Sequence, residues 1–182
     1  MPQYIALLRG INVGGNNTVA MPRLRLGFEE AGFTAVSTYI NSGNVIFTSP
    51  NTNVEELAAQ CRQLIEQHFA LQIPVAVVPA AQIANALKNA PAWWGASEES
   101  KHNAIFVIPP ATAQQIAQLV GEAKPEYEQV DFYENVIFWS APLKTFSRTR
   151  WSKIVQSKQA YNAITIRNYN TTQKLAQLVT DK

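Results

Sequence analysis

Hydrophobic and polar residues follow different periods along the chain, and these periods predict where strands and helices lie. Residues 4–9 form an apolar run that ends at Gly10, which is typical of a buried strand. Pro22 suits the first turn of a helix, and apolar side chains then recur every three or four residues as far as Ala31. The chain is therefore predicted to run from a strand through a loop into an amphipathic helix.

The pattern next predicts a hairpin, a second helix and a further strand. Residues 36–40 and 45–48 are rich in β-branched side chains, and the segment 41–44, Asn-Ser-Gly-Asn, has the chemistry of a hairpin turn. An amphipathic helix is predicted over 53–69 and a strand over 73–78. The order strand–helix–strand–strand–helix–strand is that of a ferredoxin-like fold.

The same order of elements recurs in the second part of the chain, after a short predicted helix over 81–89. Strands are predicted over 104–108, 130–133, 136–140 and 163–167. Helices are predicted over 113–120, over 145–157, and from a cap at Asn170 or Thr171 towards the C-terminus.

A short repeat supports a duplication. The sequence Asn-Val-Ile-Phe at 44–47 returns at 135–138, in the same position of each half. We therefore predict an α+β fold of two tandem ferredoxin-like halves that arose by internal duplication, each an antiparallel sheet with helices on one face. The predicted domains are a first half over 1–90, a connection over 91–102 and a second half over 103–182.

The loop over 10–21 is the strongest candidate for a functional site. The second half joins its first strand to its helix through 109–112 alone, so the longer loop is an addition that the fold does not require. Glycines let backbone N–H groups converge on an anion, and a helix start adds positive potential. Because the first and third strands of such a sheet are neighbours, this loop should meet the turn 41–44. The predicted ligand-binding residues here are Arg9, Asn12, Gly14, Gly15, Asn41, Ser42 and Asn44. The alternative is a loop that only packs against the turn.

Composition favours a folded protein in a reducing compartment. The chain has 182 residues, of which 47% are hydrophobic, which is enough for one sizeable core or two small ones. No apolar run approaches the roughly 18 residues of a membrane helix, and the N-terminus lacks a signal-peptide pattern. The lone Cys61 cannot form an internal disulfide. These features predict a cytoplasmic protein with no membrane partner, and they leave its oligomeric state open.

Charge is distributed unevenly along the chain. Residues 1–142 contain 7 Lys and Arg against 12 Asp and Glu, whereas residues 143–182 contain 8 Lys and Arg against Asp181 alone. The basic region 143–182 indicates an anionic partner or, equally well, a solvated basic face. Within it, Arg148, Arg167 and Asn168 are predicted to contribute to ligand binding.

The sequence gives no pattern that identifies a reaction. The loop has part of a phosphate-loop spacing, but Asn16 and Asn17 stand where such a loop carries Lys and then Ser or Thr. His68 and His102 are far apart and no Cys/His cluster occurs, so no metal site is predicted. Cys61 lies on the apolar face of its predicted helix, which favours a packed thiol over a nucleophile. The sequence therefore predicts no cofactor and leaves open whether the protein is an enzyme.

Three segments carry a resemblance to a known family. They read Ala-Leu-Leu-Arg-Gly-Ile-Asn-Val-Gly-Gly at 6–15, Thr-Tyr-Ile-Asn-Ser-Gly-Asn-Val at 38–45 and Thr-Ile-Arg-Asn-Tyr-Asn-Thr at 165–171. Over essentially its whole length the chain resembles the domain-of-unknown-function 1697 family of bacterial proteins. The resemblance implies duplicated ferredoxin-like halves and no activity, because the family is uncharacterised. Relatives often have Lys at the position of Asn16 and Trp at that of Tyr169, so the change at 16 favours anion contacts from backbone and Arg9.

Three functions are compatible with the sequence. The leading hypothesis is a protein that binds a small anionic ligand, such as a nucleotide or phosphorylated metabolite, at the loop 10–21. The first alternative is a nucleic-acid-binding module that uses the basic C-terminal region, although residues 45–48 lack the aromatic pattern of an RNA-recognition motif. The second alternative is a protein–protein interaction module.

Overall fold

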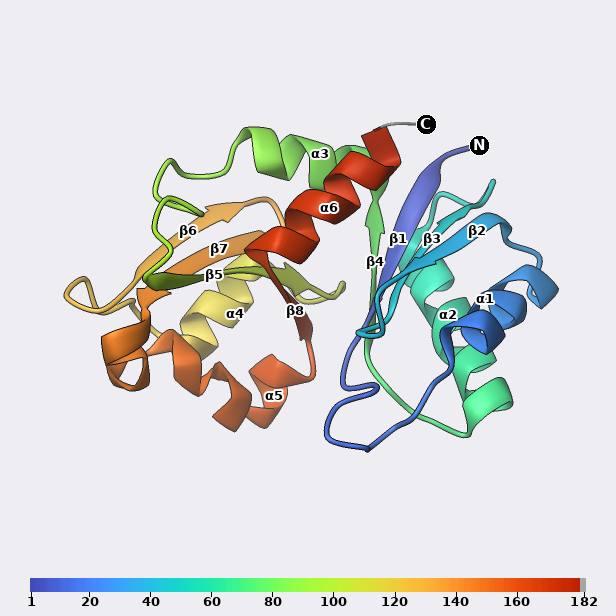
Figure 1. The fold of residues 1–182 in the computed structure, drawn as a ribbon, viewed down its shortest axis with the longest axis horizontal. Helices are drawn as coiled ribbons and strands as arrows, with labels where there is room; N and C mark the ends of the chain where they lie inside the picture. Colours follow the sequence, from blue (N-terminus) through green and yellow to red (C-terminus); the bar gives the residue numbers. More distant parts are fainter. Residues whose placement is uncertain (181–182) are drawn as a thin grey trace. The chain divides into compact units, whose positions relative to one another are not determined.

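Within residues 1–180, which the computed structural model describes, eight strands form two four-stranded sheets, one in each of two units (Figure 1). Unit 1 contains Met1–Ile83 together with the residues from Leu175 onward, and unit 2 contains Ala84–Lys174. The helices α3 (Ala80–Lys88) and α6 (Tyr169–Thr180) each begin in one unit and end in the other. No helix in this part of the chain combines the length and the apolar character needed to cross a bilayer.

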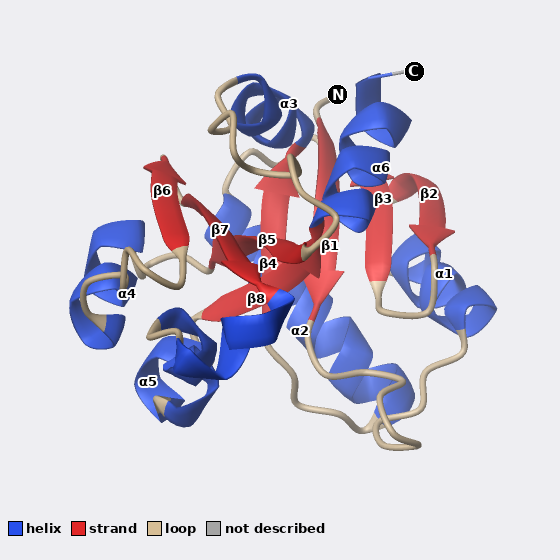
Figure 2. Ribbon diagram, turned by 60° about the vertical axis from the view of Figure 1, so that its left-hand side comes forward, coloured by secondary structure: helices blue, strands red, loops and turns tan. Residues whose placement is uncertain are grey.

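Unit 1 has the ferredoxin-like order of elements. These elements are β1 (Gln3–Leu8), α1 (Met21–Glu30), β2 (Thr34–Tyr39), β3 (Asn44–Thr48), α2 (Val54–Phe69) and β4 (Val75–Pro79). The strands lie in the order β2-β3-β1-β4, and every neighbouring pair is antiparallel. Figure 2 shows α1 and α2 together on one face of this sheet.

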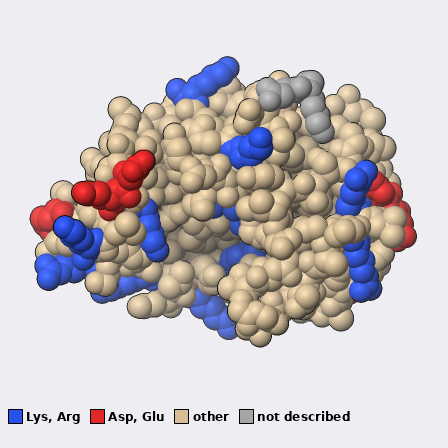
Figure 3. Space-filling view, viewed as in Figure 1, with Lys and Arg blue, Asp and Glu red and all other residues tan. Residues whose placement is uncertain are grey.

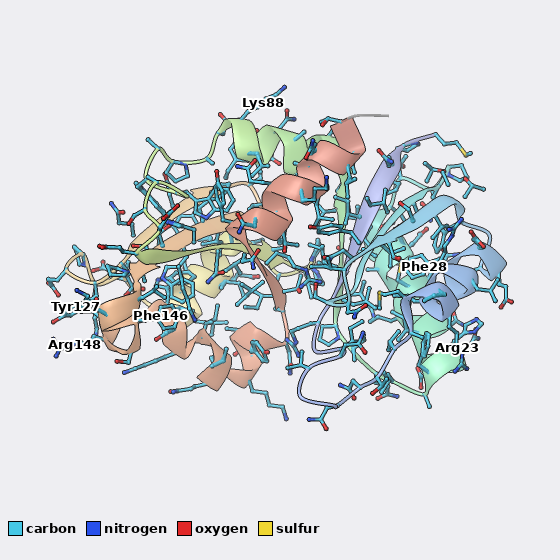
Figure 4. All side chains as sticks on the ribbon, in the orientation of Figure 1. Arg23, Phe28, Lys88, Tyr127, Phe146 and Arg148 are labelled. Carbon is cyan, nitrogen blue, oxygen red and sulfur yellow. The ribbon has the colours of Figure 1, made fainter. Side chains whose placement is uncertain are left out.

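The core of unit 1 forms because alternate strand residues meet the apolar stripes of the two helices. Phe47 of β3 packs its ring against Phe28 of α1 and against Phe33, with ring centroids 5.6 Å and 4.6 Å apart (Figure 4). The α2 helix begins as predicted, since the side chain of Asn53 accepts hydrogen bonds from the N–H groups of Glu55 and Glu56. Capping by Asn satisfies donors that a helix start leaves unpaired.

Unit 2 repeats the topology. Its elements are β5 (Ser100–Val107), α4 (Ala113–Val120), β6 (Gln129–Tyr133), β7 (Val136–Pro142), the 3₁₀ helices η1 (Leu143–Arg148) and η2 (Trp151–Gln156), α5 (Lys158–Tyr161) and β8 (Ile164–Asn168). The strand order β6-β7-β5-β8 is equivalent to that of unit 1, and all pairs are again antiparallel. The predicted fold class, two ferredoxin-like halves, is therefore confirmed.

The single helix predicted over 145–157 is wrong, because the structure has two 3₁₀ helices with extended backbone at Thr149 between them. Thr149 is fully buried, and its hydroxyl donates to the carbonyl O of Phe146 at 2.7 Å while accepting from the N–H of Ser152 at 3.2 Å. Such local side-chain bonds compete with continuous helix. The carboxylate of Glu128 also accepts hydrogen bonds from the N–H groups of Arg150 and Trp151. These bonds fix the start of the second 3₁₀ helix.

The cap predicted for the last helix is wrong by two or three residues. The α6 helix begins at Tyr169, and Asn168 caps it by accepting a hydrogen bond on Oδ1 from the N–H of Thr171 at 2.8 Å. The hydroxyl of Thr172 also donates to the carbonyl O of Asn168 at 2.8 Å. The helix therefore follows β8 directly, because the last strand residue is itself the cap.

Candidate functional site

The loop between β1 and α1 is a small, ordered hairpin. The N–H of Asn12 donates to the carbonyl O of Asn17 at 3.1 Å, and the N–H of Asn16 donates to that of Val13 at 3.0 Å. At its tip, Gly14 and Gly15 have φ values of 59° and 78°, which is the pattern of a type I′ turn. Residues 13–18 are exposed, so the glycine tip is open to solvent.

Asn12 fixes the base of this hairpin. Its Nδ2 donates to the carbonyl O of Val19 at 2.9 Å and to that of Asn41 at 2.8 Å, and its Oδ1 accepts from the N–H of Val19 at 2.8 Å. The contact with Asn41 confirms that the loop and the turn 41–44 lie together. Both amide hydrogens of Asn12 are thus donated within the chain, and these bonds shape the loop.

The turn beside the loop is tightly packed. Gly43 has a φ of 92°, and a Cβ placed there would lie 2.8 Å from side-chain atoms of Leu8 and Ile11. Asn44 is fully buried, and its Nδ2 donates to the carbonyl O of Tyr39 at 2.9 Å and to Oγ of Ser42 at 3.0 Å. Asn41 and Ser42 are exposed. The turn thus presents Asn41 and Ser42 to solvent and uses Asn44 to hold its own shape.

Arg9 stands where β1 passes into the loop. Its N–H donates to the carbonyl O of Pro74 at 3.1 Å, which attaches the start of the loop to the segment before β4. The residue is half-buried. An Arg at this point combines a permanent positive charge with a backbone that the sheet holds in place.

The predicted site residues of unit 2 lie in different surroundings. Arg148 is exposed at the end of η1, and its guanidinium lies over the ring of Tyr127 at 5.9 Å from the centroid (Figure 4). Arg167 is buried in β8, and its Nη1 donates to Oγ1 of Thr165 and to the carbonyl O of Ile166, both at 3.0 Å. Burial lowers the pKa of the Arg167 guanidinium to about 10. Asn168 follows Arg167 in the chain, whereas Arg148 belongs to a different element.

A pocket of about 430 Å³ in unit 2 is lined by Asn168 and by His102, which is not among the predicted site residues. The pocket is lined by His102, Asn168, Tyr169 and Ser97 among others. The Nδ1 of His102 lies 2.5 Å from Oγ of Ser140, and its Nε2 lies 2.6 Å from the carbonyl O of Ser97. The signal that identifies this pair is strand register, because β5 and β7 place His102 opposite Ser140.

Tyr169 packs at the edge of the same pocket. Its ring lies edge-on to that of Trp94 with centroids 4.7 Å apart, and the indole N–H of Trp94 donates to the carbonyl O of Asn103 at 2.9 Å. A Cβ on Gly95 would collide with the Tyr169 ring, so only glycine leaves room for this ring. This arrangement fixes the first turn of α6 against the chain before β5.

Within residues 1–180, metal binding and thiol chemistry depend on His, Cys, Asp and Glu side chains. No three His, Cys, Asp or Glu side chains in this range are close enough to form a metal site. Cys61 is buried in the core of unit 1, and this burial raises the pKa of its thiol well above the ordinary value. The thiol is therefore protonated and packed among apolar side chains.

Comparison with known proteins places the chain among relatives of similar fold. The solved structure of the conserved bacterial protein SP0830 from Streptococcus pneumoniae is 30% identical, with a TM-score of 0.85, and the match covers 98% of each chain. No curated protein sequence matches the chain. The model of a family described as protein of unknown function, DUF1697, matches residues 1–138. Since that match covers most of the chain, the protein belongs to the DUF1697 family.

Proposed function

We propose that this protein binds a small anionic ligand, such as a nucleotide or a phosphorylated metabolite, at the loop between β1 and α1. The observation that supports the proposal is the structure of the hairpin around Asn12. Its side chain holds the hairpin base against Asn41, while the glycine tip of the hairpin remains exposed. A loop ordered in advance loses little conformational freedom when a ligand binds.

The ligand contacts come from backbone and from charge in this proposal. Gly14 and Gly15 hold left-handed backbone, which allows successive N–H groups to face an anion as in a nest. Arg9 supplies the positive charge and a planar pair of donors for phosphate or carboxylate oxygens. The exposed turn residues Asn41 and Ser42 add polar groups, and Asn12 and Asn44 keep the two segments in place.

The test is a thermal-shift series with nucleotides and sugar phosphates on the full chain. A ligand at a hundredfold excess over its Kd should stabilise the protein by about 2.7 kcal/mol. Arg9→Ala should abolish this shift relative to its own ligand-free melt. Arg62→Ala is the matched control, because Arg62 is exposed on α2 of the same unit. The proposal fails if no anion stabilises the wild type, or if Arg9→Ala responds as strongly as Arg62→Ala.

The same series separates this proposal from the two alternatives. A nucleic-acid-binding module would bind with an affinity that falls steeply as salt rises, and it would depend on Arg148 and not on Arg9. All but the last residue of β3 are buried, so this strand does not offer the stacking surface of an RNA-recognition motif. An interaction module would instead change its light scattering with concentration and ignore small anions.

A further inference from the structure

Unit 2 contains a basic pocket whose lining includes neither Arg148 nor Arg167. Its volume is about 260 Å³, and it lies between the end of α4 and η2. Three cationic side chains line it, namely Lys124, Arg150 and Lys153, together with Ser157 and the apolar side chains of Leu119 and Ile154. Figure 3 shows Lys and Arg side chains along the edge of unit 2, with Asp and Glu side chains beside them.

One buried carboxylate fixes two of these cationic residues in place. Oε2 of Glu128 accepts hydrogen bonds from the N–H of Lys124 at 3.1 Å and from the N–H of Arg150 at 2.6 Å. Oε1 of the same residue accepts from the N–H of Trp151 at 3.0 Å and from the indole N–H of Trp139 at 3.2 Å. Two segments more than twenty residues apart in sequence are therefore joined at the pocket wall, which makes it a built feature and not a chance gathering of surface lysines.

Gly121 lets Arg150 lie across the end of α4. A Cβ on Gly121 would lie 3.1 Å from Cδ and 3.2 Å from Nη1 of Arg150, and Gly121 has a φ of 98°. A cation in this place also interacts favourably with the C-terminal end of α4, which carries about half a negative charge. That interaction alone accounts for one cation, whereas three line the pocket.

The charge of the pocket is not neutralised by ion pairs. Within residues 1–180, no ion pair involves Lys124, Arg150 or Lys153. The nearby Glu122 lines a different pocket, on the side of Phe132 and Trp151. The residues that line the pocket include three cations and no carboxylate.

We propose that this pocket binds a phosphate monoester that carries a small apolar group. The three cations and the Ser157 hydroxyl suit a phosphate dianion, and Leu119 and Ile154 suit an apolar substituent. The volume is close to the lower end of the range for ligand sites, about 300 Å³, so the ligand is small. This site is independent of the loop between β1 and α1, which belongs to unit 1.

The test uses phenyl phosphate as the probe on the full-length protein, with calorimetry for affinity and ¹⁵N NMR for location. Binding should move the amide signals of Gly121, Lys124 and Lys153, and not those of Gly14 and Gly15. Arg150→Gln and Lys153→Gln should each weaken the affinity about tenfold, since a hydrogen bond to a charged group contributes about that factor. Lys158→Gln is the matched control, because this exposed residue on α5 removes the same charge without lining the pocket.

Two further probes separate the contribution of the phosphate group from that of the apolar group. Inorganic phosphate should bind more weakly than phenyl phosphate, and phenol should not bind, because the charge supplies most of the attraction. The proposal is overturned if phenyl phosphate gives no saturable binding, or if Lys158→Gln weakens it as much as Lys153→Gln. It is also overturned if the shifted signals lie at the glycine tip of unit 1. Thermal melts of each variant establish that a lost affinity does not reflect a lost fold.

Discussion

Asn12 and Asn41 lie 29 residues apart in sequence and are joined by a hydrogen bond of 2.8 Å from Nδ2 of Asn12 to the carbonyl O of Asn41. Two more bonds from the same side chain reach the backbone of Val19. One carboxamide therefore connects the beginning of the loop, its end and the neighbouring turn. The conformation of the loop therefore depends on Asn12 as much as on the glycines.

Asn12→Ala should destabilise the protein by about 2–4 kcal/mol. The change removes three side-chain hydrogen bonds and places Ala at a φ of 54°, a conformation that Asn tolerates better. Chemical denaturation measures the effect. Asn16→Ala in the exposed part of the same loop is the control, and its change should stay within about 0.5 kcal/mol. Equal stability of the two variants would show that the Asn12 bonds do not hold the loop.

Glu128→Gln should destabilise the protein by about 2–4 kcal/mol. The buried carboxylate accepts four hydrogen bonds, and a Gln side chain turns an NH₂ group towards N–H donors that then lack an acceptor. Urea unfolding of this variant can be compared with that of Glu126→Gln, an exposed residue on the same segment. Matching midpoints for the two variants would contradict the structural role of Glu128.

Asn168→Ala should cost about 1 kcal/mol of stability through loss of the α6 cap, and Asn168→Asp should retain most of it. Asn170→Ala tests the cap expected from sequence, and since the structure places Asn170 inside the helix, its effect should be smaller than that of Asn168→Ala. Thermal unfolding followed by circular dichroism separates the three variants. A larger loss at Asn170 than at Asn168 would favour the cap inferred from sequence.

Cys61 should make stability depend on pH above its ordinary pKa of 9.0. Burial raises the pKa of this thiol in the folded state, so above pH 9 the unfolded chain loses a proton that the folded chain keeps. The stability that the buried, protonated thiol contributes is thus complete below pH 9. Above pH 9 it declines by about 1.4 kcal/mol per pH unit.

The check on Cys61 is the stability difference between the wild type and Cys61→Ala. At neutral pH the wild type should be the more stable of the two, because Ala leaves a cavity in the core. This advantage should shrink between pH 9 and pH 10. A difference that stays constant over this range would mean that the thiol titrates alike in both states. A thiol-specific reagent should also label Cys61 only after unfolding.

Both sheets could be predicted from sequence because their strands alternate or bury apolar residues and their turns carry recognisable chemistry. The helix expected over 145–157 could not be corrected in this way. Its interruption depends on the buried Thr149 and on Glu128, which is 22 residues from Arg150 in the chain. Periodicity reports which residues face a core, and it does not report a distant carboxylate that starts a new helix.

The candidate sites were predictable only in part. Glycine content and loop length identified the loop and its neighbour, the turn 41–44, because these follow from topology. The role of Asn12 as a structural anchor, and the gathering of Lys124 with Arg150, depend on side-chain bonds between segments that are distant in sequence. Arg150 and Lys153 belong to the basic region 143–182, but no sequence pattern distinguishes the pocket they line from the exposed surface of Arg148.

The composition of unit 1 has a consequence for how the chain is made. Unit 2 is one continuous stretch of sequence, whereas unit 1 contains residues from two separate stretches. During synthesis, which delivers the N-terminus first, the first sheet can form early, and the α6 residues assigned to its unit are added last. A gene fragment that stops after Ile83 therefore contains the core residues of unit 1, Tyr4 to Val77, but lacks its α6 residues. A circular permutation that moves the C-terminal helix residues ahead of β1 would make unit 1 one continuous stretch of sequence.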